Sequence, residues 1–88
     1  RNVPSSWSIK WDTRALKEAS RLPAEDQRRI VKAVEALPGN PLLGEAMKGR
    51  WKGLRRIRIG VYPAVYALKE EELIILVLTV GHRKEVYR

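Results

Sequence analysis

The sequence lacks cysteine altogether and contains a single histidine, His82. Without cysteine the chain can form neither a disulfide framework nor a thiolate nucleophile, and one histidine cannot build a Cys/His zinc site. We therefore expect a function that needs neither a metal nor an organic cofactor. A chain without disulfides also fits a reducing compartment, and the cytoplasm is the expected location.

Long apolar segments are missing as well. The longest unbroken apolar run is 73–78, far short of the roughly 20 residues of a membrane span. No signal-peptide pattern opens the chain, so we expect no association with a membrane. A length of 88 residues predicts one small domain over 1–88. Residues 1–6 lack periodicity and are expected to be a disordered arm or a remnant of cloning.

Acidic residues are scarce relative to basic ones. Eighteen Lys and Arg against 10 Asp and Glu give a formal net charge of +8, which predicts a polyanionic or an acidic protein partner. Between 48 and 58 there is no acid, and Trp51 lies among six cations: Lys48, Arg50, Lys52, Arg55, Arg56 and Arg58. This cluster is either a solvated basic face or a surface that contacts phosphates.

The first half of the chain has the periodicity of one strand and two helices. Residues 7–11 alternate large apolar with polar side chains, as a half-buried strand does. Asp12 or Thr13 can cap a helix within 12–22, and a second helix is expected within 23–37. Because so short a connection joins the two helices, we expect them to form an antiparallel hairpin.

The second half has the period of strands. Strands are expected over 54–59, 61–68 and 72–80, with 73–78 inside the sheet because it is apolar on both faces. The fold class is therefore α+β: an N-terminal strand and an antiparallel helix hairpin packed on a mostly antiparallel sheet. Alternation places Arg56 and Arg58 on one face. The expected core comprises Leu16, Ile30, Val34, Ile57, Val65, Ile75 and Val77.

Several segments together carry a resemblance to a known family. They are the helix hairpin, the basic segment at 48–58, the sequence Gly-Val-Tyr-Pro-Ala-Val-Tyr at 60–66, and the ending Val-Gly-His-Arg-Lys-Glu-Val-Tyr at 80–87. In this order and spacing they resemble RelE toxins of toxin-antitoxin systems, of the archaeal type, within the RelE/ParE superfamily. The resemblance implies a RelE-like fold and a cytoplasmic endoribonuclease. Such an enzyme cleaves mRNA in the ribosomal A site and is held inactive by an acidic, RelB-like antitoxin.

The resemblance also implies a site. Arg56 and Arg58 match the family's two strand cations, Arg83 its phosphate-binding arginine, and Tyr87 the tyrosine that stacks on or protonates the substrate. The expected RNA-binding residues are Lys48, Arg50, Lys52, Arg55 and Lys84. RNA supplies its own nucleophile in the 2′-OH, so cations that stabilise a pentacoordinate phosphorane suffice without a metal. Since arginine stays protonated, proton removal falls to Tyr87, Lys84, His82 or water.

One position departs from the family pattern. Pro63 stands where the family usually has an arginine that reaches the scissile phosphate, and proline offers neither charge nor donor. Cleavage is therefore expected to be weakened, unless Lys52 or Arg55 compensates in a natural variant. Alternatively, an arginine was replaced to make the toxin tolerable to its host. A third interpretation is that Pro63 only marks an edge or a bulge of the sheet. Two other functions stay open: a ParE-like toxin that poisons DNA gyrase, against which Arg83 and Tyr87 argue, and a catalytically silent module that binds RNA or antitoxin.

Overall fold

The computed structural model of the chain describes residues 6–81. Its strands are β1 (Ser8–Trp11), β2 (Glu45–Ala46), β3 (Leu54–Ile59), β4 (Tyr62–Lys69) and β5 (Ile74–Val80), and its helices are α1 (Thr13–Ser20) and α2 (Ala24–Glu35). Two short 3-10 turns, Leu37–Gly39 and Gly49–Trp51, precede β2 and β3. Residues 1–5 of the expected arm lie outside the described residues. No helix within the described part of the chain has the length and apolar content needed to cross a membrane.

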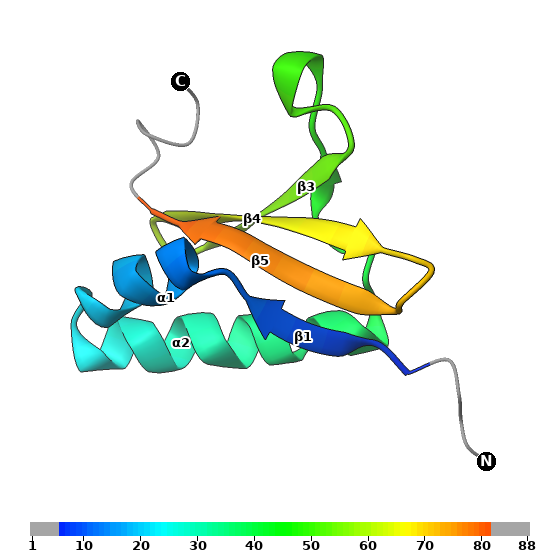
Figure 1. Cartoon of the computed structure of the whole chain (residues 1–88). Coiled ribbons are helices and arrows are strands. Elements are labelled where there is room, and N and C mark those ends of the chain that lie inside the picture. The colour runs from blue at the N-terminus through cyan, green and yellow to red at the C-terminus, as the bar shows by residue number, and fades with distance from the viewer. Residues whose placement is uncertain (1–5, 82–88) are drawn as a thin grey trace.

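The five strands form one sheet in the order β1-β5-β4-β3-β2. β1 pairs with β5 in parallel, and the other three pairs are antiparallel. The chain reverses direction between α1 and α2, and both helices lie on the same side of the sheet (Figure 1). The α+β fold predicted from the sequence is confirmed, and β5 lies inside the sheet as expected. The strand expected over 72–80 begins at Ile74, because residues up to Leu73 belong to the turn before β5, where Leu73 adopts a left-handed φ of 57°.

The ends of the two helices follow from local chemistry. Asp12 is the N-cap of α1, and its carboxylate accepts a hydrogen bond from the backbone N–H of Arg14 at 2.9 Å, which satisfies one of the free donors of the first turn. Glu25 and Asp26 occupy the first turn of α2, where the helix dipole favours negative charge. The core between helices and sheet consists of Ala15, Ile30, Val34, Leu37, Ile59, Ala64, Tyr66, Ile75, Val77 and Val80.

One predicted core residue was wrong. Leu16 is 53% exposed, whereas its neighbour Ala15 is fully buried. Consecutive residues of an α-helix are rotated by about 100°, and the stripe of α1 that meets the sheet contains Ala15, Glu18 and Ala19, so Leu16 is turned away from it. Ile57 is partly buried and packs against the core. The other five expected core residues are buried: Ile30, Val34, Val65, Ile75 and Val77.

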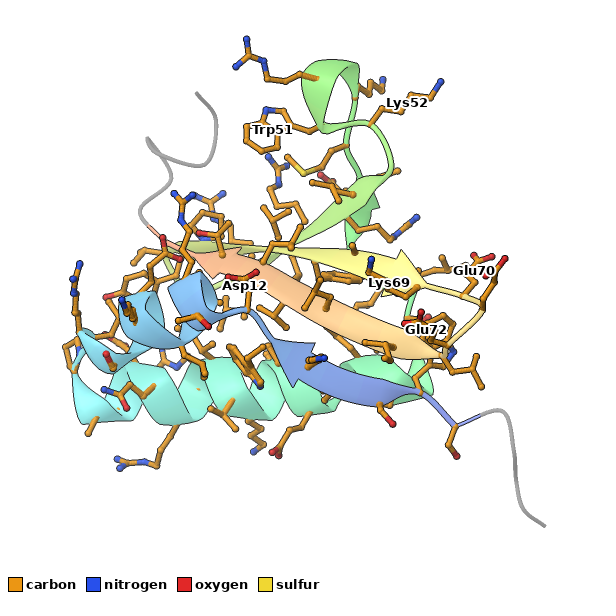
Figure 2. All side chains as sticks on the ribbon, viewed as in Figure 1. Asp12, Trp51, Lys52, Lys69, Glu70 and Glu72 are labelled. Carbon is orange, nitrogen blue, oxygen red and sulfur yellow. The ribbon has the colours of Figure 1, made fainter. Side chains whose placement is uncertain are left out.

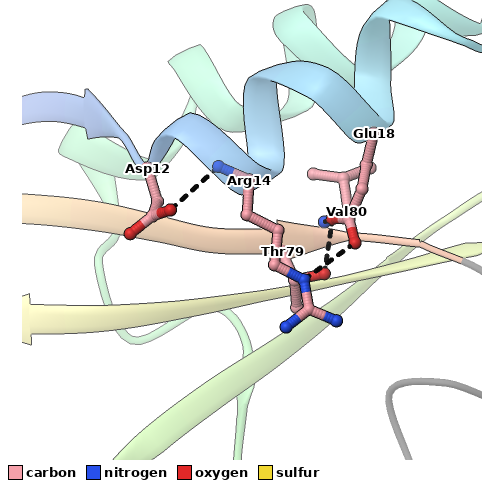
Figure 3. Close-up of polar contacts among 5 residues, drawn as sticks. All are labelled: Asp12, Arg14, Glu18, Thr79 and Val80. Carbon is pink, nitrogen blue, oxygen red and sulfur yellow. Dashed lines mark hydrogen bonds and ion pairs between the residues drawn. The ribbon is translucent and has the colours of Figure 1, made fainter.

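Helix α1 also closes the edge of β5 where β1 ends. β1 pairs only as far as Val77, so the following residues have no strand beside them on that edge. There the carboxylate of Glu18 accepts hydrogen bonds from the backbone N–H of Val80 at 2.8 Å and from the hydroxyl of Thr79 at 2.5 Å (Figure 3). The other carboxylate oxygen pairs with Arg14 Nε at 3.1 Å. A side chain thus takes the place of the missing strand at the end of β5.

Candidate functional site

The face of the sheet opposite the helices, called here the open face, carries the two strand arginines. On β3, Ile59 is buried in the helix-side core and Ile57 packs against it. Successive side chains of a strand point to opposite faces, so Arg56 and Arg58 project from the open face, about 6.6 Å apart along the strand. Across the β3–β4 pairing, Arg58 lies opposite Pro63.

Arg56 forms an ion pair with Glu45, an acid that was not predicted to lie at the site. Its Nη2 lies 2.9 Å from Oε1 of Glu45, which faces it directly from β2. Both side chains contact solvent, at 30% for Arg56 and 79% for Glu45. An ion pair so exposed contributes little to stability, so a phosphate can compete with Glu45 for the guanidinium. A hollow of about 260 Å³ borders Glu45, Arg56 and Arg58.

Arg55 has a different environment from its two neighbours. It points to the helix side, where its Nε donates to the carbonyl of Gly44 at 2.9 Å and its Nη2 donates to that of Leu42 at 3.2 Å. These bonds hold the segment before β2, which in turn places Glu45 beside Arg56. Arg55 therefore does not share a face with Pro63, and the expected compensation from Arg55 has no support in the geometry.

A buried tyrosine on β4, beside Arg55, also fixes this segment. The hydroxyl of Tyr66 accepts from the backbone N–H of Gly44 at 2.9 Å and donates to the carbonyl of Pro41 at 2.7 Å. A Cβ added at Gly44 would lie 2.8 Å from the carbonyl oxygen of Arg56 and 2.8 Å from that hydroxyl. Glycine is thus required for the close approach of this segment to β3 and β4.

Residues 47–53, called here the basic finger, connect β2 to β3 and rise from the sheet on the side away from the helices (Figure 1). A hydrogen bond from the Met47 N–H to the Leu54 carbonyl, at 2.9 Å, closes its base. Trp51 and Lys52 point to opposite sides of the finger (Figure 2). Trp51 lies toward the end of the sheet where β4 begins. Three of the predicted RNA-binding residues are exposed on the finger: Lys48, Arg50 and Lys52.

Pro63 lies near the start of β4 and is buried. Its carbonyl accepts a hydrogen bond from the Gly81 N–H at 3.2 Å. In an antiparallel pair the N–H and the carbonyl of one residue point to the same neighbouring strand. The hydrogen bond that proline cannot make is therefore the one from a backbone N–H at position 63 to the carbonyl of Gly81. The last residue pair between β4 and β5 is Ala64 with Val80. Proline thus costs the sheet one bond at the very end of the ladder. In Figure 2, Lys52 lies on the finger, well above the sheet, and points away from Trp51.

The remaining expected site residues, His82, Arg83, Lys84 and Tyr87, lie outside the described residues. Nowhere in residues 6–81 do three or more His, Asp or Glu side chains gather as metal ligands. One tyrosine has a shifted pKa, but it belongs to the helix side: the Tyr62 hydroxyl donates to Asp26 on α2 at 3.1 Å. That hydrogen bond, together with desolvation and the negative charge of Asp26, raises the pKa of Tyr62.

Glu45 is the site residue that sequence reasoning missed. β2 has only two residues, too few to show a strand period, so nothing in the sequence places Glu45 on a strand beside Arg56. The signal that finds Glu45 is the cross-strand pairing with Arg56, which exists only once β2 is placed.

Comparisons with known proteins agree with this architecture. The family described as "ParE toxin of type II toxin-antitoxin system, parDE" matches residues 9–87. No match was found among curated protein sequences. Among solved structures, the isolated E. coli RelE toxin is 28% identical with a TM-score of 0.72, over 93% of this chain and 92% of that chain.

Two further structures share the fold. A chain of the toxin-antitoxin complex RelBE2 from Mycobacterium tuberculosis gives a TM-score of 0.82 at 24% identity, over 89% of this chain and 99% of that one. A YoeB/ParE toxin from Agrobacterium tumefaciens gives 0.75 at 18% identity, over 85% of this chain and 96% of that one.

Proposed function

Because the chain belongs to the ParE toxin family of type II toxin-antitoxin systems, within the RelE/ParE superfamily, we propose that it is an endoribonuclease that cleaves mRNA in the ribosomal A site. The observation that carries the proposal is the pair Arg56 and Arg58 on the open face, with position 63 directly across from Arg58. Two guanidinium groups on one face suit the non-bridging oxygens of a phosphate.

The reaction follows from the chemistry of RNA. The 2′-OH attacks the adjacent phosphorus, the bond from phosphorus to the 5′ oxygen breaks, and a 2′,3′-cyclic phosphate and a 5′-OH result. Arg56 and Arg58 stabilise the extra negative charge of the phosphorane, with Arg83 as the further arm of the clamp. Tyr87 stacks on the substrate or protonates the leaving oxygen. Tyr87, Lys84, His82 or water takes the proton of the 2′-OH, since arginine stays protonated.

Pro63 attenuates this activity. Removing one preorganised donor at a developing oxyanion costs about 10² to 10³ in rate, and proline at 63 supplies no donor. In this geometry an arginine at 63 emerges opposite Arg58 on the open face, where it can reach the same phosphate. We therefore expect Pro63→Arg to cleave about 10² to 10³ times faster than the chain as it stands.

The partner is an acidic antitoxin, and the site of action is the cytoplasmic ribosome with its mRNA. The toxin-antitoxin complexes among the similar structures support an antitoxin, and the net charge of +8 supports an acidic one. Co-expression with the acidic protein of the same operon is expected to yield a heteromeric complex that neutralises the open face. A chain that binds no acidic partner, and is not toxic even with arginine at 63, contradicts the proposal.

The second candidate is inhibition of DNA gyrase, which the name of the matching family favours. Primer extension on an mRNA under translation distinguishes the two when Pro63→Arg is compared with Pro63→Ala, a control that changes the backbone but adds no charge. Ribosome-dependent cuts by Pro63→Arg, lost again when Arg58→Ala is added, support the nuclease. Inhibition of supercoiling by gyrase without any cut supports the alternative. Binding of RNA or antitoxin with neither activity identifies a silent module.

A further inference from the structure

We propose that Trp51 is a base-stacking residue, which holds one nucleobase of single-stranded RNA beside the arginines of the open face. This inference rests on the proposed function and deepens it, because it names a contact that neither the family pattern nor the charge cluster assigns. It concerns how the RNA is held rather than how it is cut.

Trp51 has no part in the hydrophobic core. Of the three tryptophans, Trp7 and Trp11 pack against the buried residues between helices and sheet, whereas Trp51 does not belong to that cluster. It lies half-buried on the finger, on the side opposite to Lys52 (Figure 2). A large aromatic ring placed away from the core, among cations, has a surface available for a ligand.

The finger holds this ring in a defined place. Gly49 and Gly53 have φ values of 66° and 97°, which strain any other residue, and the space around their Cβ positions is open. The glycines therefore serve the backbone conformation alone. Hydrogen bonds from the Trp51 N–H to Lys48 at 3.2 Å and from the Lys52 N–H to Gly49 at 3.0 Å complete the turn.

The finger and the arginine pair belong to one continuous surface. Lys48 at the base of the finger and Arg56 on β3 line a common hollow of about 240 Å³, together with Glu45, Ala46 and Met47. A strand of RNA whose phosphate contacts Arg56 thus continues along the finger. Aromatic stacking suits this task, because every base has a π-face and the contact does not depend on sequence.

The geometry favours RNA over a protein as the occupant of the finger. A stable protein interface buries about 800 Å² per partner around a cluster of apolar side chains. The finger offers Trp51 and Met47 as its only apolar side chains between exposed cations, which suffices for one base flanked by phosphates. An acidic protein segment is the competing occupant, and the experiment distinguishes it.

The test uses the whole chain and a short single-stranded RNA with one 2-aminopurine and 2′-O-methyl riboses, which cannot be cleaved. Stacking on the indole quenches 2-aminopurine fluorescence. We expect Trp51→Leu to abolish this quenching and to weaken binding about 5- to 150-fold, while the dependence of affinity on salt stays unchanged because no phosphate contact is lost. Trp51→Phe retains a ring and is expected to restore most of the quenching.

The matched control removes charge instead of the ring. Arg56→Ala combined with Arg58→Ala is expected to flatten the slope of log affinity against log salt by about 0.7 per lost phosphate contact, with the quenching at saturation preserved. Should Trp51→Leu bind and quench like the unmodified chain, the stacking assignment is wrong. It is equally wrong if Trp51→Leu loses an acidic protein partner while RNA binding is unchanged.

Failure of the proposed nuclease has a different signature. In that case Pro63→Arg produces no cuts on translated mRNA, yet the binding of the uncleavable RNA still depends on Trp51. Conversely, if Pro63→Arg cleaves translated mRNA while quenching and affinity for the uncleavable RNA are indifferent to Trp51→Leu, the stacking contact is overturned and the nuclease stands.

Discussion

Replacing Glu18 with alanine tests whether helix α1 closes the edge of β5. The change leaves the N–H of Val80, a fully buried residue, without its acceptor at 2.8 Å, at a cost of about 1–3 kcal/mol. It also removes the acceptor of the Thr79 hydroxyl, which adds about 0.5–1.5 kcal/mol. We expect the free energy of unfolding to fall by about 1.5–4.5 kcal/mol. For a domain of this size, each kcal/mol lowers the Tm by about 4–8 °C.

Three variants isolate the origin of that loss. Arg14→Ala removes only the ion pair of Glu18 with a side chain that is 66% exposed, and is expected to cost at most about 0.5 kcal/mol. Thr79→Val removes one hydrogen bond and is expected to cost about 1 kcal/mol. Glu18→Gln keeps an oxygen acceptor for Val80 and is expected to lie between Thr79→Val and Glu18→Ala.

Urea denaturation of the four variants, followed by circular dichroism, measures these differences. Amide hydrogen exchange at Val80 adds a local readout, because the N–H is expected to lose protection in Glu18→Ala and to keep it in Arg14→Ala. If Glu18→Ala costs no more than Arg14→Ala, the carboxylate does not replace a strand neighbour. The edge of β5 is then held by the packing of α1 alone.

Three further predictions concern the segment before β2 and the helix side. Gly44→Ala is expected to destabilise by about 1–3 kcal/mol, because its Cβ would meet backbone at 2.8 Å, whereas Gly39→Ala, with open space around it, is expected to change the Tm little. Tyr66→Phe leaves the Gly44 N–H without its partner and is expected to cost about 1–3 kcal/mol in urea denaturation. The raised pKa of Tyr62 beside Asp26 predicts a stabilisation that is complete below about pH 10 and lost as pH rises through the higher folded-state value. Tyr62→Phe is expected to remove this alkaline loss when Tm is followed from pH 8 to 11.

Elements with a local cause could be predicted from the sequence. The strand over 54–59 was placed correctly because alternation needs only neighbouring residues. Of the two predicted caps, Asp12 and Thr13, the structure selects Asp12, whose carboxylate serves the helix that it starts. The expected helix limits of 12–22 and 23–37 lie within a few residues of α1 and α2.

Features with a distant cause could not be predicted. Leu16 repeats with the right period, yet which stripe of α1 meets the sheet depends on how the helix lies against β5. Glu45 reaches the candidate site through a partner eleven residues away, Arg56, on another strand. Arg55 belongs to the same charge cluster, but its function as an anchor for the segment before β2 appears only when the carbonyls of Leu42 and Gly44 are in place. Charge and spacing in the sequence identify the cluster of cations. Only tertiary packing shows which of them lie on the open face and which anchor the segment before β2.

At position 63 the requirements of the fold can be compared with those of the proposed activity. Proline inside a sheet usually removes a ladder bond, but here the bond is the last one, beside Gly81, so the sheet loses little by it. An arginine at 63 can keep the same extended backbone. Its aliphatic carbons would be buried and its guanidinium would reach solvent, as is usual for long cationic side chains. The fold therefore does not select between proline and arginine at this position. Exchanging the two residues changes the charge beside Arg58 and is therefore expected to test the proposed phosphate site rather than the stability of the sheet.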